Sequence, residues 1–110
     1  MSEFVKVCHT QDVPVEQVKV FDVSGKSIAI CHTDKGFYAI LDVCTHDGAP
    51  LDQGELVGCQ IECPRHGARF DVTTGKVLCL PAVMPLPTFP VEVRNDELWV
   101  GVQAAVRGST

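Results

Sequence analysis

The stretches CTHDG, residues 44–48, and CPRHG, residues 63–67, share an unusual composition. Each places a cysteine, a histidine and a glycine within five residues, so each offers one thiolate and one imidazole. The first reads Cys-x-His and the second Cys-x-x-His, with sixteen residues between the first histidine and the second cysteine. Glycine in such a loop lets the backbone turn sharply and present N–H groups to an anionic centre. The two stretches therefore predict a pair of loops that hold a metal centre.

Two kinds of centre can use two cysteines and two histidines. A closed zinc site is one, but zinc spacings typically place Cys with Cys and His with His, whereas each loop here mixes the two. Leu51 follows the first loop, and Phe70, Asp71, Gly75 and a proline-rich segment follow the second; together with the two loops, this pattern resembles the Rieske iron–sulfur proteins. The resemblance covers the whole chain and favours an iron–sulfur cluster over zinc.

The resemblance implies one [2Fe–2S] cluster, with Cys44 and Cys63 on one iron and His46 and His66 on the other. Two neutral imidazoles in place of two thiolates leave such a cluster less negative, so it is easier to reduce than an all-cysteine cluster. In the family the histidine-ligated iron lies nearest the surface. We therefore expect electrons to leave, and redox partners to dock, near His46 and His66.

Sequence differences from the high-potential Rieske proteins indicate which branch of the family this chain resembles. Those proteins carry an extra cysteine in each loop, joined as a disulfide, where this chain has Ala49 and Arg65. They also carry hydroxyl donors to the cluster sulfurs where this chain has Ala68 and Phe70. Fewer donors stabilise the reduced cluster less, which predicts a potential toward the lower end of a range that begins near about −150 mV. The chain thus resembles the soluble Rieske ferredoxins.

That resemblance implies a one-electron carrier and not an enzyme. Such ferredoxins pass electrons from an NAD(P)H-linked flavoprotein reductase to the terminal oxygenase of an aromatic-ring-hydroxylating system. The chain is also too short for a second iron site of the two-histidine, one-carboxylate kind. Two alternatives stay open: a Rieske carrier or small subunit for another client, such as a monooxygenase, a reductase or a redox sensor, and a zinc-stapled interaction module.

Length, composition and net charge exclude several other classes of protein. A chain of 110 residues, 45% of them hydrophobic, can enclose one core, so we expect a single domain and little disorder. The net charge of −5 argues against nucleic acid or an anionic membrane as the main partner. The first residues lack a basic start followed by an apolar run, so we expect a cytoplasmic protein. A monomer is the simplest assumption about its oligomeric state.

Period-two alternation predicts an all-β fold, a Rieske-type antiparallel sandwich or barrel. We expect a single Rieske domain over 1–110, with an outer framework of about 1–42 and 76–106 and an inserted cluster-binding subdomain of about 43–75. The dipeptide Asn95-Asp96 predicts a two-residue hairpin turn, and 77–91 reads as a packed extended loop. The predicted strands are 4–8, 17–23, 27–31, 37–41, 55–62, 69–72, 76–79, 91–94 and 97–102.

The other reactive side chains have simpler interpretations. Four cysteines outside the ligand set lie in or beside predicted strands, where a free thiol packs as a small apolar group: Cys8, Cys31, Cys59 and Cys79. Cys59 is four residues before Cys63, but alternation places it with Val57 and Ile61 on one face of the predicted strand 55–62, which favours burial over ligation. His9 and His32 lack the loop pattern, so we expect them to face solvent or to be satisfied by hydrogen bonds. Arg65 and Arg69 either influence the cluster and its partner or are merely solvated. A third, proline-rich loop packs over the cluster in the family, and here it contains Pro81, Pro85 and Pro87.

Overall fold

A computed structural model describes residues 4–43, 50–51, 54–64, 67–79 and 84–101 of the chain. Its regular elements are β-strands and one short 3-10 helix, η1 (Thr10–Asp12), which confirms the all-β prediction. The strands are β1 (Phe4–His9), β2 (Val18–Val23), β3 (Lys26–Thr33), β4 (Gly36–Leu41), β5 (Glu55–Val57), β6 (Gln60–Glu62), β7 (Arg69–Asp71), β8 (Val77–Cys79), β9 (Thr88–Phe89), β10 (Val91–Arg94) and β11 (Glu97–Gly101).

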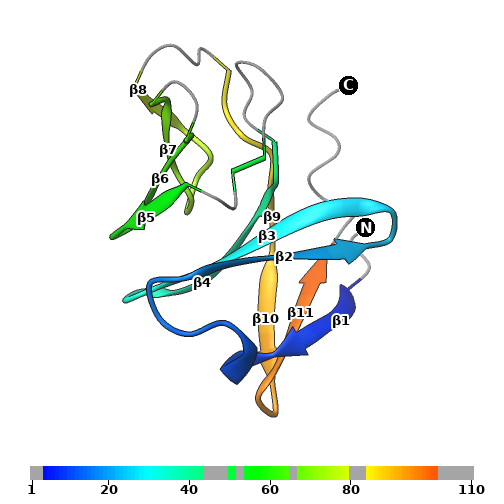
Figure 1. Ribbon diagram of the computed structural model, residues 1–110. Helices are drawn as coiled ribbons and strands as arrows, with labels where there is room; N and C mark the ends of the chain where they lie inside the picture. The colour runs from blue at the N-terminus through cyan, green and yellow to red at the C-terminus, as the bar shows by residue number, and fades with distance from the viewer. Residues whose placement is uncertain (1–3, 44–49, 52–53, 65–66, 80–83, 102–110) are drawn as a thin grey trace.

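The strands form three antiparallel sheets (Figure 1). Sheet A has the order β1-β11-β10, sheet B the order β2-β3-β4-β9, and sheet C the order β5-β6-β7-β8. Sheet C lies at one end of the molecule and contains only strands that are close together in sequence (Figure 1). Sheet C extends to Cys79 because β8 pairs with β7 and not with a strand of sheet A or sheet B. The predicted limits of an inserted subdomain, about 43–75, stay a prediction.

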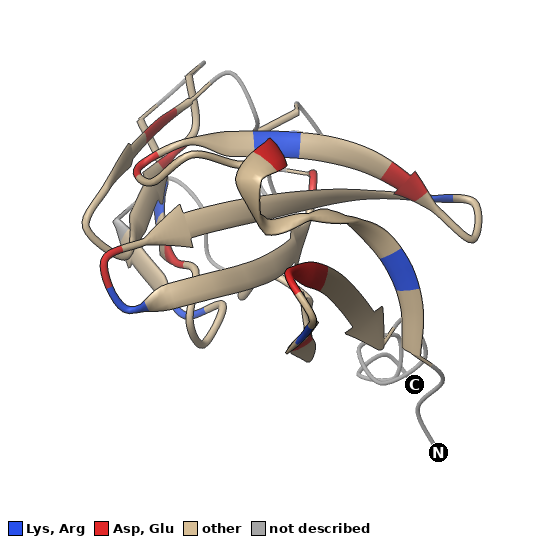
Figure 2. Cartoon of the chain, turned by 90° about the horizontal axis from the view of Figure 1, so that it is seen from below, with Lys and Arg blue, Asp and Glu red and all other residues tan. Residues whose placement is uncertain are grey.

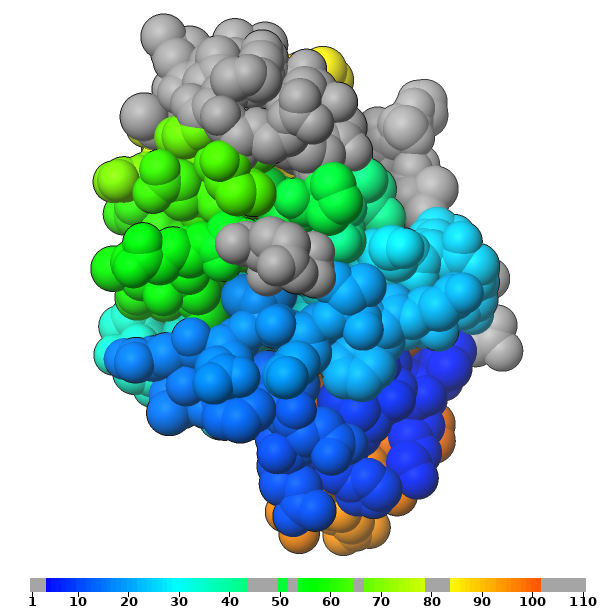
Figure 3. Space-filling view, viewed as in Figure 1, coloured from blue at the N-terminus to red at the C-terminus, as the bar shows by residue number. Residues whose placement is uncertain are grey.

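The central strand β3 of sheet B is buried on both faces because its alternate residues contribute to two cores. Ile28 and Ile30 pack with residues of sheet A, whereas the alternate residues Ala29 and Cys31 pack with residues of sheet C. All four side chains have an exposed fraction of 0%, which explains the unbroken apolar run at this point of the sequence. In Figure 3 the residues of sheet C, in green, lie directly against the cyan and blue residues of sheet B.

The turn at Asn95-Asp96 is the two-residue hairpin that the sequence predicts. Arg94 and Glu97 are directly paired across β10 and β11, and the turn residues have φ of 50° and 65°. Positive φ at both positions is the geometry of a type I′ turn, whose twist matches that of the flanking strands. Asparagine and aspartate tolerate this left-handed region better than most residues.

Two expectations about residues 55–62 are wrong. We expected one strand, but the structure has two, β5 and β6, joined by a tight turn in which Gly58 has φ of 60°. Because the chain reverses there, Val57 and Ile61 do not share a face: Val57 is 63% exposed and Ile61 is fully buried. Cys59 sits in the turn and is only partly buried against the core, not part of a buried strand face.

The segment 77–91 is less uniform than a packed loop. It contributes the strands β8 and β9, and β9 pairs with β4 in sheet B. Leu86 and Phe89 are buried, but Leu78 and Met84 are 42% and 61% exposed. The short β9 and the helix η1 were not predicted, because two or three residues are too few for a periodic pattern to show. No helix among the described residues is long and apolar enough to cross a membrane.

Candidate metal centre

Cys63 is the ligand candidate that the structure describes, and it lies directly after β6 with an exposed fraction of 1%. Its N–H donates to the Ala68 carbonyl at 2.7 Å, and its own carbonyl accepts from the Gly67 N–H at 3.1 Å. Gly67 has φ of 80°, a conformation that favours glycine. These bonds fix both ends of the second loop to each other where it joins β6 and β7.

The first loop is closed at its base by a side chain that sequence reasoning did not single out. Asp42 follows β4, and its Oδ1 accepts from the Leu51 N–H at 2.8 Å in a buried hydrogen bond. Asp42 is 8% exposed and Leu51 is fully buried. The one sequence signal for it is a carboxylate at the end of an apolar strand, two residues before the predicted ligand Cys44.

The proline-rich segment is joined to the end of β4 and to the turn after β7 by backbone hydrogen bonds. The Leu86 N–H donates to the Gly75 carbonyl at 2.8 Å, and the Leu41 N–H donates to the Pro87 carbonyl at 3.1 Å. A Cβ at Gly75 would collide with the Leu86 carbonyl, so this crossing requires glycine. Leu86 is 4% exposed and belongs to the same buried cluster as Cys63. Leu86 of the proline-rich segment therefore packs in the core that contains Cys63.

Cys44, His46 and His66 lie outside the described residues, as do Ala49, Arg65 and Pro81. Within the described part of the chain, no three Cys, His, Asp or Glu side chains are grouped as metal ligands. The donor chemistry nevertheless fits a Rieske centre, because a buried thiol at Cys63 sits in a pinned glycine loop and the sequence supplies the remaining thiolate and imidazoles. The predicted ligand set stays a prediction.

Cys8 and Cys31 behave as the sequence predicts, whereas Cys59 lies in the turn between β5 and β6 and is only partly buried. Cys8 and Cys31 are free and buried. Burial first, and then the nearby charge of Asp12, raises the pKa of the Cys8 thiol to about 11. Burial, followed by the charge of Asp42, raises the pKa of Cys31 to about 12. Both thiols are protonated at neutral pH and poor nucleophiles. The side chain of Cys79 lies outside the described residues.

Neither remaining histidine is placed as a ligand. The His9 side chain is 51% exposed, and its Nδ1 lies 3.9 Å from Asp12 Oδ2. The His32 ring stacks on Phe37 with the ring centroids 3.9 Å apart, and its Nδ1 donates to the Val13 carbonyl at 2.7 Å. Because a carbonyl only accepts, this bond fixes the proton on Nδ1. One histidine thus faces solvent and the other is hydrogen-bonded, as predicted.

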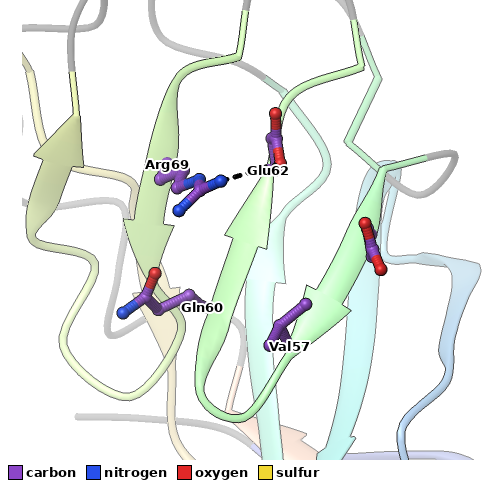
Figure 4. A pocket seen from close by; sticks show the side chains of 5 residues that line it. Val57, Gln60, Glu62 and Arg69 are labelled. Atoms are coloured by element: carbon purple, nitrogen blue, oxygen red, sulfur yellow. Dashed lines mark hydrogen bonds and ion pairs between the residues drawn. The ribbon is translucent and has the colours of Figure 1, made fainter.

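A shallow pocket of about 130 Å³ lies on the outer face of sheet C, lined by Glu55, Val57, Gln60, Glu62 and Arg69 (Figure 4). Glu62 Oε1 accepts from Arg69 Nη2 at 3.4 Å, the dashed line of Figure 4. A Cβ built on Gly67 would lie 3.5 Å from Glu62 Oε2, so this carboxylate borders the second loop. Figure 2 shows acidic and basic residues interspersed along the described chain.

We expect Glu62→Gln to raise the reduction potential of the cluster, because it removes a negative charge beside the second loop. Solvent screening of this half-exposed pair limits the effect to the order of 10 mV. Glu92→Gln is the matched control: Glu92 also pairs with an arginine, at 2.7 Å from Arg94, but lies in sheet A. Voltammetry that gives equal shifts for the two variants would contradict a local effect of Glu62.

Comparisons with known proteins identify the class. A profile of the Rieske [2Fe–2S] domain matches residues 3–90. The ferredoxin component of the naphthalene 1,2-dioxygenase/salicylate 5-hydroxylase systems of Ralstonia sp is 43% identical over 84 residues, which cover 76% of this chain and 81% of that protein. The chain belongs to the Rieske [2Fe–2S] family.

Solved structures agree in fold over nearly the whole chain. The ferredoxin of carbazole 1,9a-dioxygenase from Nocardioides aromaticivorans IC177 superposes with a TM-score of 0.86 at 34% identity, covering 91% of this chain and 98% of that one. A chain in the complex of reduced oxygenase and oxidised ferredoxin of carbazole 1,9a-dioxygenase gives 0.85 at 36% identity, covering 92% and 94%. The protein is accordingly a carrier of electrons with a Rieske-type [2Fe–2S] cluster, and not itself an enzyme.

Proposed function

We propose that this protein accepts single electrons from an NAD(P)H-linked flavoprotein reductase and delivers them to the terminal oxygenase of a ring-hydroxylating dioxygenase system. The observation that carries the proposal is the match, over most of both chains, to ferredoxin components of such systems. The complex of oxygenase and ferredoxin among the similar structures supports an oxygenase as the partner.

We propose Cys44, His46, Cys63 and His66 as the cluster ligands. The cluster, when bound, takes up and releases one electron. Cys63 supplies a thiolate from the buried side of the second loop, where the bonds to Ala68 and Gly67 hold its backbone. His46 and His66 would present the exposed edge of the centre, so partner docking is expected around them. Leu51, Phe70 and Leu86, each no more than 4% exposed, exclude water from the inner side.

A low potential fits the side chains around Cys63. Ala68 and Phe70 are fully buried and share a hydrophobic cluster with Cys63, and neither carries a hydroxyl group. Hydrogen bonds to cluster sulfurs stabilise the reduced state, so their absence lowers the potential. A low potential suits a carrier that is reduced by a flavoprotein and must reduce an oxygenase in turn.

Ala68→Ser and Phe70→Tyr are each expected to raise the potential. One added hydrogen bond contributes about 1 kcal/mol, which is about 40 mV for a one-electron couple. The check is voltammetry of the single variants and of the pair, with Phe89→Tyr as the control. Phe89 is 5% exposed but belongs to the other core. A potential well above zero for the unmodified protein would show that the argument from Ala68 and Phe70 is wrong.

We also propose that the protein works as a monomer in the cytoplasm. Free buried thiols at Cys8 and Cys31 are typical of a reducing compartment. Size-exclusion chromatography with light scattering tests the monomer, and cell fractionation tests the compartment.

The client is tested with purified components. A ring-hydroxylating oxygenase and its reductase, supplied without their own ferredoxin, should turn over only when this protein is added with NAD(P)H. Electron transfer from the reductase without any transfer to the oxygenase would favour a different client.

A further inference from the structure

Asp42 is a buried carboxylate whose hydrogen bond the electron-transfer role does not by itself explain. Among the described residues it is one of two buried polar or charged side chains, the other being Thr33. Burying a carboxylate is costly unless it is hydrogen-bonded. The bond from Leu51 N–H to Asp42 Oδ1, at 2.8 Å, is itself buried and joins residues nine positions apart.

The backbone around Asp42 is anchored on two further sides. The Asp42 N–H donates to the Ser27 carbonyl on the neighbouring strand at 2.9 Å. The preceding residue, Leu41, donates its N–H to the Pro87 carbonyl at 3.1 Å. Asp42 therefore stands where sheet B, the proline-rich segment and the start of the first loop meet.

The other end of the bond is equally fixed. Leu51 is fully buried and belongs to the core cluster that contains Cys63. Its carbonyl accepts from the Gly54 N–H at 2.9 Å, and a Cβ at Gly54 would collide with the Glu62 carbonyl next to Cys63. The Asp42 carboxylate thus connects the end of β4 to a segment packed against the end of β6, directly before Cys63. The residues between Asp42 and Leu51 include Cys44 and His46.

We propose that Asp42 is a positioning residue for the cluster: by accepting the Leu51 N–H, its carboxylate holds together the two ends of the first loop, which carries the proposed ligands Cys44 and His46. The proposal rests on the ligand set of the proposed function. It assigns the effect to the geometry of an acceptor atom and not to the negative charge near the cluster.

Three substitutions separate acceptor geometry from charge. Asp42→Asn keeps an oxygen acceptor in place and loses the charge. Asp42→Ala loses both, and Asp42→Glu keeps the charge but moves the acceptor by one methylene group. The readouts on the holoprotein are the rate of loss of visible absorption in excess EDTA and the linewidth of the EPR signal after reduction with dithionite.

The positioning account predicts at least ten-fold faster cluster loss and a broadened EPR signal in Asp42→Ala. Asp42→Asn should stay within about three-fold of the unmodified protein, and Asp42→Glu should lose the cluster at least three-fold faster than it. Asp71→Ala is the matched control, because Asp71 Oδ1 accepts the Thr73 N–H at 2.8 Å but closes a turn and not a ligand loop. Its cluster loss should stay within about three-fold.

The proposal is overturned if Asp42→Ala keeps the cluster and the EPR linewidth of the unmodified protein. It is also overturned if Asn behaves like Ala, or if Glu behaves like Asp, because charge and not acceptor geometry would then decide. Should the Ala variant fail to fold, the Asn and Glu variants decide alone. The proposed function fails separately, when the unmodified protein itself gives no Rieske spectrum.

Discussion

Cys63→Ala is expected to abolish the visible absorption and the EPR signal of the cluster while the β-sheet fold remains. An alanine side chain cannot bind iron, so the substitution removes one of the four proposed ligands. The backbone bonds of Cys63 to Ala68 and Gly67 do not involve the side chain and persist. Iron analysis should fall from two atoms per chain to nearly none, with far-UV circular dichroism reporting the fold.

Cys31→Ala is the matched control for that experiment. Cys31 and Cys63 are 0% and 1% exposed and belong to the same buried cluster, so their truncation to alanine costs a similar free energy of unfolding, on the order of 1 kcal/mol. Only Cys63 is a proposed ligand, and Cys31→Ala should keep both irons. Equal loss of iron in the two variants would show that core damage, and not ligation, explains the result.

His66→Cys is expected either to lower the potential by about 100 mV or more or to prevent assembly of the cluster. A thiolate in place of a neutral imidazole adds negative charge to the centre and moves it toward the all-cysteine clusters near about −400 mV. His9→Cys makes the same substitution at an exposed position in sheet A and should leave the potential unchanged. Voltammetry of both variants checks the prediction, and normal spectra and potential in His66→Cys would remove His66 from the ligand set.

The sequence predicts best where a local rule decides the structure. Asn95-Asp96 lies between two alternating apolar segments, so the hairpin and its left-handed turn could be predicted from the dipeptide. Cys8 and Cys31 lie in alternating strands, and their burial could be predicted in the same way. The all-β class follows from the same periodicity.

The predictions from sequence fail where a turn interrupts an alternating pattern, and they miss features that depend on contacts between distant residues. Residues 55–62 alternate as one strand would, and Gly58 inside the pattern was the only signal of the turn that divides them. The same alternation predicts Cys59 on a buried strand face, whereas the turn leaves it only partly buried. The role of Asp42 depends on the Leu51 N–H nine residues away, and no local rule connects the two positions. The ligand motifs could be predicted from the sequence because their chemistry needs particular residue types at short spacing.

The central claim is that two histidines and two cysteines hold a [2Fe–2S] cluster. Electron–nuclear double resonance on the reduced protein, grown with ¹⁵N-labelled histidine, tests it most directly because only nitrogen bound to iron couples strongly to the unpaired electron. We predict strong couplings from two histidine nitrogens and two irons per chain. A colourless, EPR-silent protein with one zinc per chain, or an iron–sulfur signal without histidine couplings, would contradict the account.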